Sequence, residues 1–459
     1  MANELIAEIS RATLEDLDIP ASGTITGTQH LASYNWIEAP KGKPTVAVPG
    51  SPDLWSPPKG PSRLKKDSGH VYIAQNAARH PDSPLEPLFR ALYVLEPTFD
   101  INSIDVVTDR NNIRKLLGFV NWRWSGDKRE DFTIHIEVKN NTAIFCREET
   151  KVEEYIGPKE FRGYGHSFEK RYTTRQVSGS TGHHRIIQYS FGGLKFILRH
   201  ETDGYVGVPT THSSQQSAGH QAREVDDLSS VLDALSLSSK SGEPEVAHPE
   251  GSKLAILKEG QVVPLPSTLE IKTRVSHRPL AFEDVVSQLW VSQTPKLVRA
   301  YHTKGVFAEP TVEDVAIQVK AWEGQNQKDL RMLAGLITEI RDIVKDNGGK
   351  AILKYDANVD KLLFYELGDK KMLPDDLYAK WEDTDSDEED SDDEDSDDED
   401  SDEEDSDEEE EEDDDEQDID DDDIDSEYAD LDHVDSDVDT PGQSNKELTG
   451  AVSGKTAKA

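Results

Sequence analysis

Charged residues stand two positions apart at several places in this 459-residue sequence. The stretch STLEIKTR holds Glu270 and Lys272, and the stretch ETD holds Glu201 and Asp203. Successive side chains of a β-strand point to opposite faces, so each pair is predicted to share one face of a strand. Glu169 closes the stretch GYGHSFE and is predicted to lie at a further strand end.

Carboxylates that gather at strand ends favour a metal site. Magnesium and manganese ions prefer hard oxygen ligands, and crowded acids repel one another unless cations neutralise them. A lysine beside such acids steadies the attacking water or the charged phosphate. The pattern therefore indicates a metal-dependent phosphodiesterase. A surface ion pair that contributes little to stability is the simpler interpretation of Glu270 and Lys272 taken alone.

Hydrophobic periodicity predicts the elements that position these residues. The alternating stretch from 132 to 149 predicts a hairpin that turns at Asn140 and Asn141. IDVVTDRNNIRKLL reads as a strand leading into a helix, DLRMLAGLITEIRDIVKDN has helical spacing, and AILKYD and KLLFYEL predict a final pair of strands. Residues 87–380 are therefore predicted to form one mixed domain with a strand-rich centre.

Composition predicts segments outside this domain or inserted into it. Residues 1–86 are predicted to form a partly ordered arm, because 20–85 are rich in Pro, Gly and Ser. Residues 208–262 are predicted to be a mobile insertion, and 381–459 a disordered acidic tail. The chain is accordingly expected to fold without the residues after Tyr378.

The charge of the chain is concentrated in the tail. Positions 382–439 hold 41 acidic residues in 58, and taking these from the total of 93 leaves 52 acidic against 50 basic residues elsewhere. A serine recurs every five residues before acidic ones, as at casein kinase 2 sites, at Ser386, Ser391, Ser396, Ser401 and Ser406. The tail either keeps the chain in solution or docks basic proteins. A single cysteine and the lack of a long apolar run predict a nuclear or cytoplasmic protein with no membrane partner.

Five motifs follow one another along the predicted domain. RNNIRKLL begins at Arg110, GHSFE ends at Glu169, ETD and EIK hold the two charged pairs, and SQLWVSQTPKLVRAY carries Gln288. In this order they resemble the motifs of the DXO family of 5′-end decapping, deNADding and pyrophosphohydrolase exoribonucleases, as in a divergent, fungal-type member. The resemblance spans about residues 92–367. In the last motif, Ser287 stands where the family has alanine.

The resemblance implies a fold, an activity and roles for residues. The fold would be α+β, a mixed β-sheet core flanked by helices, distantly similar to the PD-(D/E)xK nucleases. The activity would be hydrolysis at RNA 5′ ends with two Mg²⁺ or Mn²⁺ ions. Glu169, Asp203 and Glu270 would bind metal directly, and Glu201 would act through metal-bound water. Lys272 and Gln288 would orient water and phosphate, and Arg110 would contact the RNA 5′ end.

Two departures from the family pattern leave alternatives open. Thr202 stands where the family has a hydrophobic residue, and the interval from Asp203 to Glu270 is long. The alternatives are a catalytically weak factor that binds RNA ends, and an interaction protein that works through its acidic tail. The resemblance also leaves open a 5′→3′ exoribonuclease as a partner.

Overall fold

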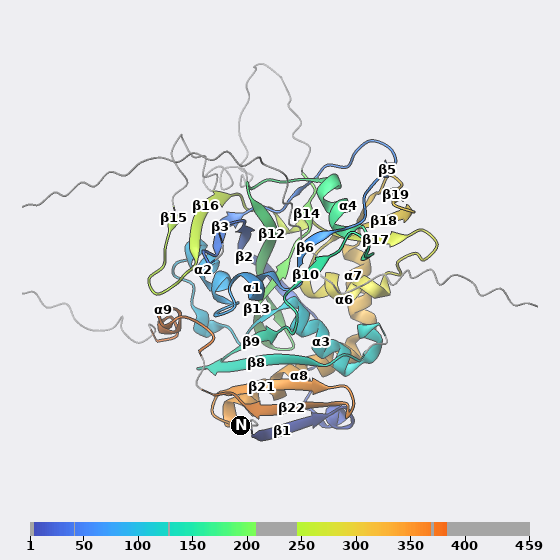
Figure 1. The fold of residues 1–459 in the computed structure, drawn as a ribbon. Coiled ribbons are helices and arrows are strands. Elements are labelled where there is room, and N and C mark those ends of the chain that lie inside the picture. Colours follow the sequence, from blue (N-terminus) through green and yellow to red (C-terminus); the bar gives the residue numbers. More distant parts are fainter. Residues whose placement is uncertain (1–3, 41, 127–128, 208–245, 369–370, 383–459) are drawn as a thin grey trace, which may run out of the picture.

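A long mixed sheet runs through the molecule (Figure 1). The computed structural model describes residues 4–40, 42–126, 129–207, 246–368 and 371–382. Within these ranges the large sheet has both parallel and antiparallel neighbours. Its strands are, in spatial order, β1 (Leu5–Ser10), β22 (Lys361–Glu366), β21 (Lys350–Asp356), β8 (Phe132–Lys139), β9 (Thr142–Glu148), β7 (Val106–Asp109), β13 (Leu194–Glu201), β12 (Ser180–Phe191), β2 (Thr26–Ile37), β3 (Thr45–Gly50), β16 (Ala255–Gly260) and β15 (Val246–Ala247).

A smaller sheet meets the large one close to the predicted site. Its strands follow the order β11 (Thr173–Thr174), β4 (Leu54–Trp55), β14 (Gly204–Tyr205), β17 (Thr268–Val275), β18 (Lys296–Thr303), β19 (Val306–Phe307) and β5 (Ser62–Arg63), with β20 (Val312–Asp314) beside β18. A separate pair joins β6 (Gly69–Tyr72) to β10 (Glu153–Ile156). Strand β13 of the large sheet ends at Glu201, and β14 of the small sheet begins at Gly204. The ETD stretch therefore lies where the chain crosses from one sheet to the other.

Helices cover both faces of the large sheet. Neighbouring residues of a strand point to opposite faces, so a single strand contributes to the core on each side. Ile187 of β12 belongs to a core with α3, α6, α7 and α8, and Ile186 belongs to a core with α2 and α9. The helices are α1 (Gln75–Arg79), α2 (Glu86–Leu95), α3 (Arg110–Val120), α4 (Gly165–Tyr172), α6 (Glu283–Ser292), α7 (Ala316–Gln325), α8 (Gln327–Asp346) and α9 (Asp375–Ala379). The predicted class, a mixed α+β sheet flanked by helices, is confirmed.

The prediction that residues 1–86 form a partly ordered arm is wrong. Strands β2 and β3 lie inside the large sheet, where β2 pairs with both β12 and β3. Tyr34 and Trp36 of β2 are fully buried. The prolines and glycines that suggested an arm fall mainly in the connections around these strands, whereas the strand sequences themselves are apolar enough to enter the core.

The predicted insertion is also shorter than 208–262. Residues 208–245 lie outside the described residues, but residues 246–262 return to the large sheet. There β16 pairs in parallel with β3, from Ala255 opposite Thr45 to Gly260 opposite Gly50. The apolar stretch LAIL, residues 254–257, supplies buried side chains to this edge of the sheet.

The domain ends later than the predicted boundary at residue 380. Trp381 is 1% exposed, packs against Phe89 and donates a hydrogen bond from Nε1 to Thr142 Oγ1 at 3.0 Å. Tyr378 likewise donates to the buried Glu137, at 2.6 Å. A truncation after Tyr378 would remove this tryptophan from the core, so the expectation that the chain folds without it needs correction. The domain therefore includes Trp381.

Replacing Trp381 with alanine is expected to lower the free energy of unfolding by about 3–5 kcal/mol, because a large buried ring is lost. Chemical denaturation measures this change. Trp122→Ala is the matched control, since the Trp122 residue is 46% exposed and its loss should change the free energy of unfolding little. Equal effects of the two substitutions would show that Trp381 does not anchor the domain.

No helix in the described parts of the chain is long and apolar enough to cross a membrane.

Candidate active site

Glu270 lies at the centre of a buried polar cluster. It stands on β17 and is 2% exposed. In the small sheet β17 pairs in parallel with β18. Lys272 Nζ is 2.8 Å from its Oε1, as predicted for two residues on one strand face. Gln288 Nε2 of α6 donates to the same oxygen at 2.6 Å, and Arg110 Nη1 of α3 donates to Oε2 at 3.3 Å. Three motifs that are far apart in the sequence therefore meet at one carboxylate.

Asp203 lies beside Glu270 because its Oδ2 accepts a hydrogen bond from the backbone N–H of Ile271, at 2.7 Å. Burial, and then repulsion by Glu270, raises the pKa of Asp203 to about 8. Burial also raises the pKa of Glu270, but Lys272 and Arg110 outweigh it, so that pKa is lowered overall. At neutral pH the pair therefore keeps one proton, on Asp203, which hydrogen-bonds to Glu270.

Glu169 and Glu201 reach the same site from other elements. Glu169 lies on α4 and not at a strand end as predicted, because the seven residues of GYGHSFE are also compatible with about two turns of helix. Both residues line a cavity of about 60 Å³ together with Asp203. Gly182 lines the same cavity, and its lack of a side chain leaves room for the Glu201 carboxylate, because a Cβ there would be 3.0 Å from Glu201 Oε1. All four predicted acids thus lie in or next to one cavity.

Two acids of this region were missed by the sequence analysis. Asp53 lines the cavity, accepts a hydrogen bond from Thr173 Oγ1 at 3.3 Å, and has a pKa raised by burial. Asp67 accepts from the backbone N–H groups of His166 and Ser167, at 3.3 and 2.9 Å, in the first turn of α4. It thereby anchors the helix that carries Glu169. Both acids fall in the segment interpreted as an arm, and no local signal distinguishes them from other loop acids.

The donor set fits a hard divalent cation in its chemistry. Its members are carboxylates, which Mg²⁺ and Mn²⁺ prefer, and the pKa of Asp203 is raised first by burial and then by the neighbouring Glu270. In the described part of the chain, however, no three His, Cys, Asp or Glu side chains are placed to hold an ion together. Glu270 is instead neutralised by Lys272 and Arg110. An ion would therefore have to displace the proton on Asp203 and the ammonium of Lys272.

The raised pKa makes a prediction about stability. The folded protein holds a proton on Asp203 that the unfolded chain releases near pH 4, so this contribution to stability is lost as pH rises through about 8. In metal-free buffer, Asp203→Asn should remove that loss and melt higher than wild type at pH 8 to 9. Melting curves from pH 5 to pH 9 in chelator measure it, and parallel curves for the two proteins would refute the assignment.

The fold and the site together define a mixed α+β protein with a buried carboxylate cluster where two sheets meet. The chain belongs to the family described as a domain of unknown function (DUF8563), whose model matches residues 5–381. The sequence matches no curated protein.

Solved structures with a similar arrangement of elements include proteins named Rai1 and Dxo1. Rai1 of S. pombe is 12% identical, with a TM-score of 0.46 over 79% of this chain and 99% of that one. Rai1 of Candida albicans, solved with pU5 and Mn²⁺, is 10% identical, with a TM-score of 0.49 over 83% and 99%. Dxo1 of K. lactis, solved with manganese, is 9% identical, with a TM-score of 0.41 over 79% and 95%.

Proposed function

We propose that this protein is a metal-dependent hydrolase that acts on RNA 5′ ends, by decapping, pyrophosphohydrolysis or deNADding, with or without 5′→3′ exonuclease activity. The observation that carries the proposal is the convergence on Glu270. Side chains from α3, β17 and α6 contact its carboxylate, and Asp203 lies against it. Structural ion pairs do not require a glutamine, a lysine, an arginine and a second acid around one buried carboxylate, whereas phosphoryl chemistry uses such a set.

We assign each residue a role that its place in the site supports. Two Mg²⁺ or Mn²⁺ ions, held by Glu169, Asp203 and Glu270 and through water by Glu201, would neutralise phosphate charge and acidify water. Lys272 would turn its ammonium from Glu270 to the phosphate, since it is only partly buried. The Gln288 amide, 2.6 Å from Glu270, fixes that carboxylate or orients water. Arg110 holds the negative 5′ end.

A binding protein without turnover is the second candidate. It is favoured by the two cations that already neutralise Glu270. In such a protein the phosphate would meet Lys272 and Arg110, with the acids setting their positions. With either candidate function, the acidic tail, which lies outside the described residues, would recruit basic proteins, and a 5′→3′ exoribonuclease is a further partner.

The experiment that tests the proposal uses the full chain and four RNAs that differ only in the 5′ end: triphosphate, cap, NAD or monophosphate. The label is placed in the 5′ nucleotide, and its release is followed with Mn²⁺, with Mg²⁺ and with chelator. We expect metal-dependent release from at least one RNA. Binding of these RNAs without any release would overturn the hydrolase and support the binding protein.

A further inference from the structure

Three segments of the chain bring cations to one end of the small sheet, where α4, β5 and β19 lie (Figure 1). The segments 54–66, 170–176 and 299–308 hold four, three and two Lys or Arg residues, respectively, and no Asp or Glu. They contact one another, because β4 of the first segment pairs with β11 of the second and β5 pairs with β19 of the third. We call the following exposed members of this set the basic face: Lys59, Arg63, Lys65, Lys66, Arg171 and Lys304.

The charge of the basic face is not balanced within the folded domain. Arg63 Nη1 donates to the backbone carbonyl of Lys304 at 3.4 Å, and Lys66 Nζ donates to the backbone carbonyl of Glu160 at 3.5 Å. No ion pair joins a cation of the basic face to a carboxylate of the described residues. A cluster of unpaired cations without interspersed acids attracts a polyanion.

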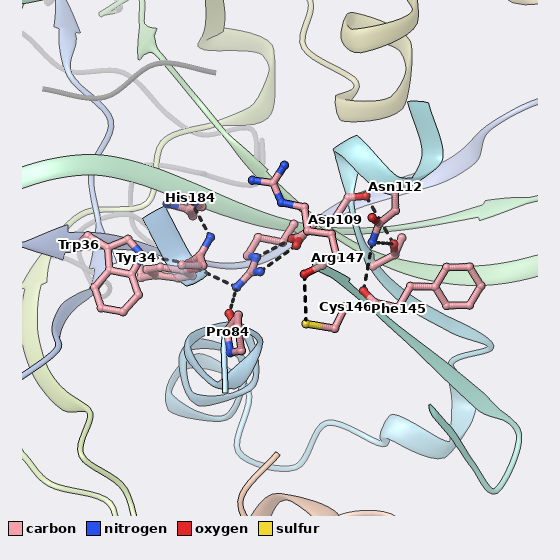
Figure 2. Close-up of polar contacts among 12 residues, drawn as sticks. Tyr34, Trp36, Pro84, Asp109, Asn112, Phe145, Cys146, Arg147 and His184 are labelled. Atoms are coloured by element: carbon pink, nitrogen blue, oxygen red, sulfur yellow. Dashed lines mark hydrogen bonds and ion pairs between the residues drawn. The ribbon is translucent and has the colours of Figure 1, made fainter. Parts of the chain in front are cut away.

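Two arginines of the large sheet are, by contrast, already paired. Figure 2 shows the surroundings of Asp109, whose two oxygens accept hydrogen bonds from Arg199 Nε at 2.7 Å and Nη2 at 2.9 Å. Arg147, also labelled there, has its Nη1 3.0 Å from Glu149 Oε1. Pairs of this kind leave no charge for an outside partner, whereas the basic face does.

The polyanion nearest to the basic face is the acidic tail of the same chain. Positions 382–439 hold 41 acidic residues and no Lys or Arg, and they begin at Glu382, where the described part of the chain ends. A compact domain of this size is roughly 55 Å across, and 58 residues of extended chain span up to about 190 Å, so the tail is long enough to reach any face. A tethered segment acts at an effective concentration on the order of millimolar, which favours it over free polyanions.

We propose that the acidic tail binds the basic face of its own chain and shields that face from other polyanions, including RNA. The attraction is electrostatic, so it weakens as salt screens the charges. A basic protein that takes up the tail would uncover the face, and the binding of such a partner would thereby control access of RNA. The docking of the tail needs no catalytic activity, and only its consequence for RNA rests on the proposed function.

Carbodiimide cross-linking of the full chain tests the docking, because this reagent joins a lysine only to a carboxylate in contact with it. At low salt we expect cross-links from tail carboxylates to Lys59, Lys65, Lys66 and Lys304, and about fivefold fewer at high salt, where the Debye length is short. Lys328 on α8 is the matched control, since it is exposed and has no ion pair to a described carboxylate, and it should cross-link rarely. Mixing ¹⁴N- and ¹⁵N-labelled protein identifies the cross-links that lie within one chain.

The cross-linking outcomes are judged without RNA. Cross-links within one chain that concentrate on the basic face support the docking, even where no RNA is hydrolysed. Equal cross-linking of the face lysines and Lys328 would mean that the tail meets the surface at random, and cross-links only between chains would assign the tail to a second copy. Either result overturns the docking, and it does so even where RNA ends are hydrolysed.

A double-mutant cycle on the full-length chain tests the shielding. One change replaces the acidic residues of positions 383–439 by serine and glycine, and the other replaces the four lysines of the basic face by glutamine. Neutralising the tail alone should tighten the binding of a 20-nucleotide single-stranded RNA by at least about tenfold at low salt in chelator, and the face variant should abolish this gain. The exposed control set Lys43→Gln, Lys195→Gln and Lys328→Gln should keep the gain. No gain on neutralising the tail, or a gain that persists without the face lysines, as expected for repulsion at a distance, would overturn the shielding; melting curves show that each variant is folded.

Discussion

Glu270→Gln is expected to reduce the release of the 5′ nucleotide by about 10³-fold, which corresponds to about 4 kcal/mol of transition-state stabilisation. The amide keeps the shape of the side chain and an oxygen for the hydrogen bond from Gln288, but it removes the charge that faces Arg110 and Lys272. A direct metal ligand is also lost. Single-turnover assays with saturating RNA measure the effect on the chemical step.

The matched control is Glu137→Gln. Glu137 is also a buried glutamate on a strand beside a lysine, with Lys350 Nζ 3.5 Å from its Oε1, and it lies outside the acid cavity. It should lose stability without losing turnover per folded molecule. Equal losses of turnover in the two variants would indicate a stability effect, and full activity of folded Glu270→Gln would remove Glu270 from the site.

Lys272→Ala is expected to lower the rate by about 10²-fold, or about 2.7 kcal/mol, because a positive charge near the reacting phosphate is removed. Metal binding should persist and become tighter, since the ammonium 2.8 Å from Glu270 Oε1 no longer competes for the carboxylate. The two effects therefore have opposite signs. Rate measurements and a metal titration on the same preparation separate them.

Lys350→Ala is the control for Lys272→Ala, because the Lys350 side chain is exposed to a similar degree and also pairs with a buried glutamate. Its rate and its metal affinity should match those of wild type. If Lys272→Ala retains the wild-type rate, the lysine serves only to neutralise Glu270. The protein that binds RNA ends without turnover would then be the better account.

Much of the candidate site could be predicted from the sequence, because the alternation of side chains in a strand and the spacing of apolar residues in a helix are local patterns. The alternation in STLEIKTR predicted that Glu270 and Lys272 share a face, and their side chains meet on β17. The hairpin predicted at Asn140 is present between β8 and β9, with Asn140 at a φ of 52°. The strand that leads into a helix at Arg110 is present as β7 and α3.

Other parts of the site depend on contacts that no local period reports. Asp53 and Asp67 reach the region from the N-terminal quarter of the chain, where proline and glycine content suggested an arm. Glu169 was predicted at a strand end, because seven residues with mixed polarity do not distinguish a strand from two turns of helix. Trp381 stands directly beside the acidic tail, and its contacts with Phe89 and Thr142, which are far away in the sequence, place it in the core.

Calorimetric titration of Mn²⁺ into the full chain, its Asp203→Asn variant and the control Glu137→Gln tests most directly whether the acid cluster is a metal site. The acidic tail is identical in all three proteins, so any ions that it binds cancel in the comparison and the difference between the proteins reports the cluster. We predict a tight component in wild type and in Glu137→Gln that strengthens as pH rises through about 8, when Asp203 loses its proton, and that is absent from Asp203→Asn. Identical titrations of wild type and Asp203→Asn would contradict the account.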